Sequence, residues 1–196
     1  MKTYTLPCLD KIDWSKAEVQ CIEQCSWSPN AAPEARVQGL YIKDKALAFR
    51  LVSLAAPSRA VNTEPDSSVW EDSCLECFLS FDGKSYMNIE VNANAAFLCC
   101  FGPDRHERKF VRSTGVPLPE VSAAKSDAGW EIEISIPLGC IEALWGCKAK
   151  SGDSFSANFY SCGDMTPAPH YAAWNRVETE TPDFHRPEFF GSIIIG

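Results

Sequence analysis

Apolar and polar residues alternate along several short stretches of the chain. Residues 85–94, SYMNIEVNAN, are the clearest case, because every odd position from Met87 to Ala93 is apolar. The even positions carry a phenol, three amides and a carboxylate: Tyr86, Asn88, Glu90, Asn92 and Asn94. Successive side chains of a β-strand point to opposite faces, so this pattern predicts a strand with one apolar and one polar face. Asn is a poor strand former, and a row of short amides is therefore unusual for a face that only meets water.

Similar strand-like runs recur along the whole chain between turn signals. They cover residues 37–43, 46–54, 73–81, 85–93, 96–102, 129–137, 154–163 and 189–196. Asp82-Gly83 separates two of them and predicts a β-hairpin. Many short strands joined by polar turns predict an all-β protein, an antiparallel β-sandwich of the immunoglobulin or jelly-roll kind.

One or two short helices are expected within this sandwich. After Pro137, which suits a first helical turn, Leu138, Ile141 and Leu144 fall at helical spacing, and Gly146 can end the helix. A weaker helical signal runs from residue 14 to residue 24.

Length and composition fit one domain spanning residues 1–196. The chain has 196 residues, of which 45% are hydrophobic, enough for a sizeable core. The net charge of −8 comes without a basic stripe, so neither nucleic acid nor an anionic membrane is an expected partner. The N-terminal residues lack the apolar run of a signal peptide, and no window is long enough for a membrane span, so a cytoplasmic location is expected.

The ten cysteines are expected to be free thiols that behave as small apolar residues: Cys8, Cys21, Cys25, Cys74, Cys77, Cys99, Cys100, Cys140, Cys147 and Cys162. Cys74 and Cys77 form a CxxC pair, the spacing of many zinc sites. The pair lies inside a predicted strand, where residues three apart face opposite ways, and no second CxxC is present. No metal site is therefore predicted.

Three blocks, at residues 69–97, 129–146 and 158–195, together resemble the carbohydrate-binding module family 9-like proteins of the DOMON-like β-sandwich superfamily. The similarity runs from about Cys21 to the end of the chain. It depends on a D-S-x-x-E-x-F strand, on an Ile-Pro step before the helix and on the closing PEFFGSIII. The resemblance implies a β-sandwich that binds carbohydrate without catalysis, although some DOMON-like branches bind haem instead.

Sugars are recognised by aromatic rings that stack on the pyranose and by amides, carboxylates and guanidinium groups that bond the hydroxyls. The resemblance implies two gripping tryptophans, and Trp70 and Trp174 are the candidates; the alternative is that each ring caps the core. Arg105 follows a turn at a sheet end, where it can reach a ligand or simply face water. Arg108 is expected to face water.

The polar face of the 85–93 strand has two interpretations. Tyr86, Asn88, Glu90 and Asn92 can line a ligand cleft, or they can form a buried polar network, which would need many partners. Partners for either role are available in the last block: His170, Asn175, His185 and Arg186. Both interpretations predict a partner for Glu90, plausibly an arginine.

Two other functions remain open. A glycoside hydrolase would need two carboxylates, for which Glu76 and Glu90 are candidates on neighbouring strands. A haem protein would need an axial ligand pair, such as Met87 opposite His170 or His185. No catalytic residue and no cofactor is predicted from spacing alone.

The resemblance also implies that loop oxygens could hold structural calcium. Candidate carboxylates are Asp66, Glu71, Asp72, Asp82 and Asp104. The chain has no D-x-D-x-D-G calcium loop, however.

Overall fold

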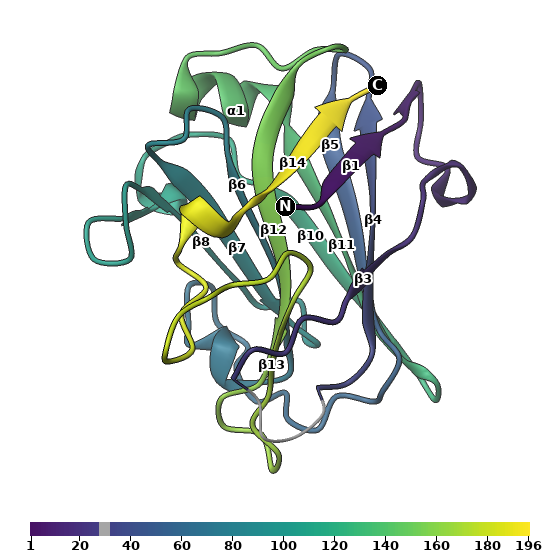
Figure 1. Ribbon diagram of the computed structural model, residues 1–196, viewed down its shortest axis with the longest axis vertical. Helices are drawn as coiled ribbons and strands as arrows, with labels where there is room; N and C mark the ends of the chain where they lie inside the picture. The colour runs from purple at the N-terminus through teal and green to yellow at the C-terminus, as the bar shows by residue number, and fades with distance from the viewer. Residues whose placement is uncertain (28–31) are drawn as a thin grey trace.

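The computed structural model describes residues 1–27 and 32–196 and shows two β-sheets packed face to face (Figure 1). The first sheet has eight strands in the order β1-β14-β12-β6-β7-β8-β9, with β13 beside β12. The strands of this sheet are β1 (Thr3–Leu6), β6 (Cys74–Ser80), β7 (Tyr86–Asn92), β8 (Phe97–Gly102), β9 (Lys109–Phe110), β12 (Ser154–Cys162), β13 (Tyr171–Ala173) and β14 (Gly191–Ile195).

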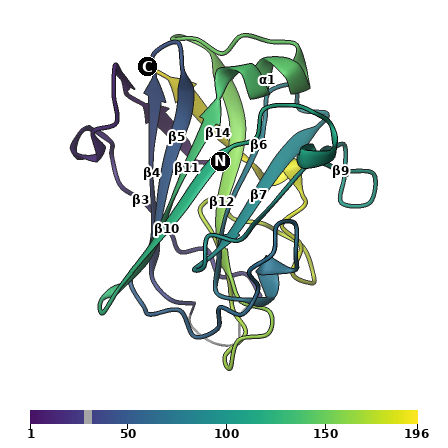
Figure 2. The ribbon, with the colours of Figure 1, turned by 180° about the vertical axis from the view of Figure 1, so that it is seen from behind.

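The second sheet has six strands in the order β10-β11-β5-β4-β2, with β3 beside β4. Its strands are β2 (Cys8–Leu9), β3 (Gln20–Ile22), β4 (Ala35–Ile42), β5 (Ala46–Ser53), β10 (Glu120–Ser126) and β11 (Gly129–Pro137). The pairs β1–β14 and β2–β4 are parallel, and the other paired strands are antiparallel. The predicted all-β sandwich is confirmed, and Figure 2 shows the second sheet from the other side.

Helical structure is limited to short pieces. The predicted helix is confirmed as α1 (Leu138–Trp145), and Gly146 ends it with a left-handed backbone at φ 70°. The 3-10 turns are η1 (Trp14–Lys16), η2 (Val69–Glu71), η3 (Val111–Ser113) and η4 (Pro187–Phe189). No helix in the described part of the chain has the length and apolar character needed to cross a membrane.

The weaker helical signal at residues 14–24 is wrong. The helix ends after one 3-10 turn, because Ala17 already has an extended backbone. The chain then enters β3, where pairing with β4 buries Ile22. Pairing with a distant strand outweighs a weak local preference for helix.

All eight strand-like runs form strands, and Asp82-Gly83 turns between β6 and β7 as predicted. The sequence pattern missed several shorter or more polar strands: β1, β2, β3, β9, β10 and β13. Five of these have two to four residues, and β10 is a mostly exposed edge strand. Strands of this kind are defined by the partner they pair with, because they are too short or too polar to show an alternation of their own.

The main core lies between the sheets. Met87, Ile89 and Val91 of β7 face Ile132 and Ile134 of β11 within one cluster of fully buried side chains. The apolar half of the alternating stretch therefore forms the core, as its pattern predicts.

The first sheet is also covered on its outer face, by the segment of residues 163–190. A second apolar cluster lies there, with Phe78, Tyr160, Phe184 and Phe190 among its buried members. The rings of Tyr160 and Phe184 stack at 4.0 Å, and the Tyr160 hydroxyl donates to the Phe184 carbonyl oxygen. In Figure 1 the later part of this segment, drawn yellow-green to yellow, crosses the sheet near β12 and β7. Side chains on this face are buried although they point away from the main core.

Trp174 belongs to the main core and cannot grip a ligand. Its side chain is 0% exposed, and its ring packs against those of Tyr4 and Phe159. The indole N–H donates to Gln20 Oε1 at 3.2 Å. The ring also lies over Gly191, where an added Cβ would come within 2.3 Å of it. The alternative, that this tryptophan caps the core, is the correct one.

Replacing Trp174 by Ala should therefore lower the free energy of unfolding by about 3–5 kcal/mol, the usual cost of emptying an aromatic site in a core. Urea denaturation followed by circular dichroism measures the change. Ile194→Ala is the control, because that side chain is 37% exposed on neighbouring β14 and its loss should cost much less. A Trp174→Ala protein as stable as the wild type would contradict the core assignment.

Candidate ligand-binding site

A pocket of about 520 Å³, counted to its open mouth, lies on the covered outer face of the first sheet. Its floor is formed by Glu76 of β6, Glu90 of β7 and Cys162 of β12. Aromatic side chains line its walls: Trp70, Tyr171 and Phe184. The charged and polar residues around these are Arg105, Arg108, Asp164, Asp183 and His185.

The two floor glutamates are cross-strand partners. Glu76 lies directly opposite Glu90 in the β6–β7 register, and the residues are 2% and 3% exposed. Burial, and then repulsion between the two carboxylates, raises the pKa of Glu76 well above its usual value. Burial also raises the pKa of Glu90, against the opposing effect of Arg108. The pair therefore takes up a proton more readily than exposed carboxylates do.

Glu90 has the arginine partner that the sequence predicted, but it is Arg108. The Arg108 Nη1 atom lies 3.6 Å from Glu90 Oε1, and Asn88 Nδ2 donates to the same oxygen at 2.9 Å. The expectation that Arg108 faces water is wrong, because the 103–108 loop folds back over β8. Gly102 permits this approach: an added Cβ there would lie 2.5 Å from the Arg108 Cα.

Trp70 lies at the pocket wall as a half-buried side chain in η2. Its backbone carbonyl accepts from the Asp164 N–H at 3.1 Å, which joins η2 to the loop after β12. None of the close ring pairs among the described residues includes Trp70. The half-buried ring packs against the outer apolar cluster and borders the pocket.

Other predicted site residues support the pocket from behind. Tyr86 is buried, and its hydroxyl lies 2.9 Å from Nδ1 of the lining residue His185. Burial, followed by the nearby charges of Arg108 and Arg105, lowers the pKa of His185 to about 3, so this imidazole is neutral near pH 7. Arg105 lines the pocket mouth as an exposed side chain.

Three predicted ligand contacts lie elsewhere. His170 lines a separate cavity, and its Nδ1 atom lies 3.0 Å from the Ala168 carbonyl oxygen. Arg186 pairs with Glu188 and lies over the Phe189 ring. Asn92 belongs to the buried network of Asp72. The polar row of β7 is therefore divided: Glu90 lines the pocket, whereas Asn92 lies in a buried polar network.

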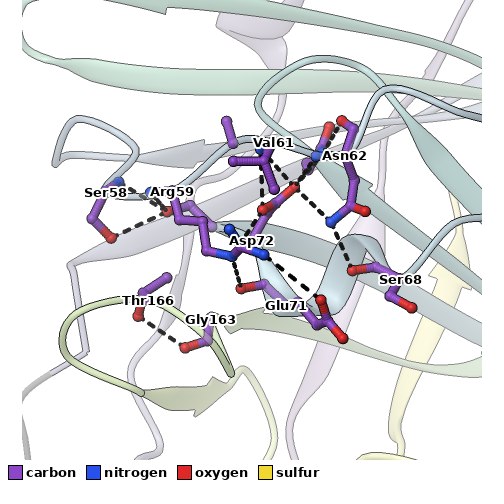
Figure 3. Close-up of polar contacts among 12 residues, drawn as sticks. Ser58, Arg59, Val61, Asn62, Ser68, Glu71, Asp72, Gly163 and Thr166 are labelled. Atoms are coloured by element: carbon purple, nitrogen blue, oxygen red, sulfur yellow. Dashed lines mark hydrogen bonds and ion pairs between the residues drawn. The ribbon is translucent and has the colours of Figure 1, made fainter.

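Asp72 is the centre of that network, in which Arg59 and Asn62 also bond to the carbonyl oxygens of Glu71 and Ser68 at η2 (Figure 3). Its fully buried carboxylate accepts from the Val61 N–H at 3.2 Å, the Asn62 N–H at 2.9 Å and Asn92 Nδ2 at 2.8 Å. Arg59 Nε lies 3.3 Å away. Burial by itself would raise the pKa of Asp72, but the hydrogen bonds from Asn62, Asn92 and Val61 outweigh it and lower the pKa.

The carboxylates considered for calcium are not gathered at one place: among the described residues, no three of them bring ligand oxygens within 4.8 Å of one another. Asp72, Asp82 and Asp104 accept backbone N–H groups, and Asp66 and Glu71 pair with arginine side chains.

The axial pair required for haem is not brought together either. Met87 lies in the main core between the sheets, whereas His185 contacts Phe78 and Tyr86 on the outer face of the same sheet. His170 lies in the separate cavity.

The sequence analysis missed several lining residues: Asp164, Tyr171, Asp183, Phe184, and Cys162 on the floor. Glu76 was noticed only as a possible catalytic carboxylate. Glu76 belongs to the D-S-x-x-E-x-F motif and lies on the same strand face as Phe78. This position was the one feature of the sequence that could have indicated that Glu76 and Glu90 share the pocket floor. The loop residues carry no local pattern that indicates a pocket.

The comparisons with known proteins agree with this architecture. The model of carbohydrate-binding family 9 matches residues 7–195, so the chain belongs to that family. A putative carbohydrate-binding protein from Bacteroides uniformis has 24% identity and a TM-score of 0.80, over 100% of this chain and 99% of that one.

A family 9 module from Caldicellulosiruptor kristjanssonii, solved with glucose, has 14% identity and a TM-score of 0.69, over 100% of this chain and 96% of that one. A family 9 module from the same organism, solved with cellotriose, has 14% identity and a TM-score of 0.67, over 99% of this chain and 93% of that one. No curated protein matches the chain.

Removing the charge of Asp72 should destabilise the fold. Asp72→Asn leaves Arg59 and the backbone donors without their anion, and breaking a buried pair of this kind costs about 3–5 kcal/mol. Because the folded pKa is lowered, the stabilisation is present above the unfolded pKa of about 3.9 and is lost as the pH falls through the folded value. The difference in the free energy of unfolding between variant and wild type should therefore become smaller below about pH 4.

Urea denaturation at pH 7 and at several acidic pH values measures this effect. Glu64→Gln is the control, since Glu64 is an exposed carboxylate on the same loop. A difference that stays constant with pH would show that the charge of Asp72 is not the stabilising element.

Proposed function

We propose that the protein binds a mono- or oligosaccharide without catalysis, and that one sugar unit enters the pocket beside Trp70. The observation that carries the proposal is the combination of an unstacked, half-buried indole with buried charged groups in one pocket. Family membership supports it, as do the glucose and cellotriose in the structures of the relatives.

The chemistry of the pocket suits a polyhydroxylated ring. The Trp70 face offers a surface for the C–H groups of a pyranose. Arg105 and Arg108 can donate to hydroxyl oxygens, while Glu76 and Glu90 can accept from hydroxyl groups. Because Asn88 and Arg108 already fix Glu90, little side-chain freedom is lost when a ligand binds.

The same geometry favours binding over hydrolysis. A glycoside hydrolase places its two carboxylates on either side of the scissile bond. Glu76 and Glu90 are neighbours on one floor, directly opposite each other in adjacent strands. Side chains so placed approach a ligand from the same side, and both are almost completely buried.

Replacing Trp70 by Ala should weaken sugar binding about tenfold or more, a loss of about 1.4 kcal/mol. Isothermal titration calorimetry with glucose and with cellotriose measures the affinities. Trp14→Ala is a matched control: Trp14 is also half-buried, but it donates to Glu133 and packs on a cluster of the second sheet. Its loss should leave the affinity unchanged.

Two results would contradict the proposal. One is the absence of binding by the wild-type protein across a panel of mono- and oligosaccharides. The other is an equal loss of affinity in both tryptophan variants, which would place the sugar away from this pocket.

A further inference from the structure

Two buried thiols and one buried carboxylate meet at the pocket floor. The sulfur atoms of Cys74 and Cys162 and a carboxylate oxygen of Glu76 all lie within 4.8 Å of one another. Strand geometry explains the cluster. Cys74 and Glu76 are two residues apart on β6 and share a face, and Cys162 lies directly opposite Cys74 in the β12–β6 register. All three side chains are therefore held by the centre of a sheet.

Among the described residues, no ion pair joins the carboxylate of this cluster to a cation. Arg108 pairs with Glu90 across the floor, and the Glu76 side chain receives its hydrogen bond, among the described residues, from Cys162 Sγ at 3.0 Å. A thiol is a weak donor, and a buried carboxylate normally has a much stronger partner. Glu76 is thus a buried acid with two sulfur atoms beside it and a second acid opposite, an arrangement in which a cation would be favourable.

The donor set indicates which cation. Two sulfurs and one carboxylate oxygen suit a borderline-soft divalent ion such as Zn²⁺ and do not suit Mg²⁺ or Ca²⁺. Tetrahedral zinc with bonds of about 2.3 Å to sulfur and 2.0–2.2 Å to oxygen keeps its ligands about 3.5–4 Å apart. Cys162 Sγ lies 3.0 Å from Glu76 Oε1, and all three ligand atoms lie within 4.8 Å of one another. Small movements of the side chains would therefore bring the ligand atoms to the spacing that zinc requires.

We propose that Cys74, Glu76 and Cys162 bind one Zn²⁺ or similar soft divalent cation, with the fourth coordination position open to the pocket. Glu76 and Cys162 line the pocket, so a water molecule there can complete the coordination.

Glu76 and Cys162 also line the proposed sugar pocket, but metal binding can be measured without any sugar. Cd²⁺ is the probe, because thiolate coordination gives a near-ultraviolet charge-transfer band. The exposed cysteines Cys8, Cys21 and Cys25 are replaced by Ser in all samples to remove adventitious thiols. A phosphine reductant keeps the remaining thiols reduced.

The reduced protein should bind one Cd²⁺ per chain, and Zn²⁺ should compete for the site. Cys162→Ser should weaken Cd²⁺ binding at least tenfold, and so should Glu76→Gln. Cys77→Ser is the matched control, because Cys77 lies on the same strand but faces the main core. Trp70→Ala should keep the metal while losing the sugar, which separates a failure of one proposal from a failure of the other.

Anomalous diffraction from Cd²⁺-soaked crystals tests the site without any variant, in case a substitution prevents folding. A peak between Cys74, Glu76 and Cys162 is the expected result. Absence of saturable binding, a peak elsewhere, or unchanged affinity in folded Cys162→Ser and Glu76→Gln proteins would each overturn the proposal.

Discussion

The central constraint on this protein is that its first sheet is buried on both faces. A strand such as β7 then needs partners for the polar side chains that point toward the covering segment, because an unpaired polar group in such a place is costly. Asn92 binds Asp72, Tyr86 meets His185, and Glu90 pairs with Arg108. The unusual row of amides and acids on β7 is the inner lining of a covered face.

The pocket arises where this covering is incomplete. Segment 163–190 packs apolar rings over most of the face, but at Glu76 and Glu90 it leaves an opening bordered by Trp70. The Asp72 network fixes the loop that carries Trp70, and the Asp164 N–H joins η2 to the covering segment. The polar groups that stabilise the fold are therefore connected to the groups that line the pocket. The rigidity of the stabilising network preorganises the pocket side chains.

The candidate site could be predicted only in part. Trp70, Glu90 and Arg105 line the pocket, and they were candidates because their residue types suit sugar binding. The blocks that carry the family resemblance include Trp70 and Glu90 but not Arg105. Trp174 has the same chemical character, yet it is a core residue. The residues next to a tryptophan in the sequence do not show whether its ring contacts a ligand or packs in the core against a glycine such as Gly191. Burial depends on the whole fold.

The sequence by itself determined the local elements. Alternation with period 2 defined the longer strands and their core face, and left-handed Gly146 ended α1. Only the tertiary structure decided which outer face would be covered, that Arg108 would return to Glu90, and that Cys74 would find Cys162 instead of the neighbouring Cys77. The physical reason is the range of the interactions: strand alternation and helix ends depend on residues a few positions apart, whereas these contacts join side chains on separate strands and loops.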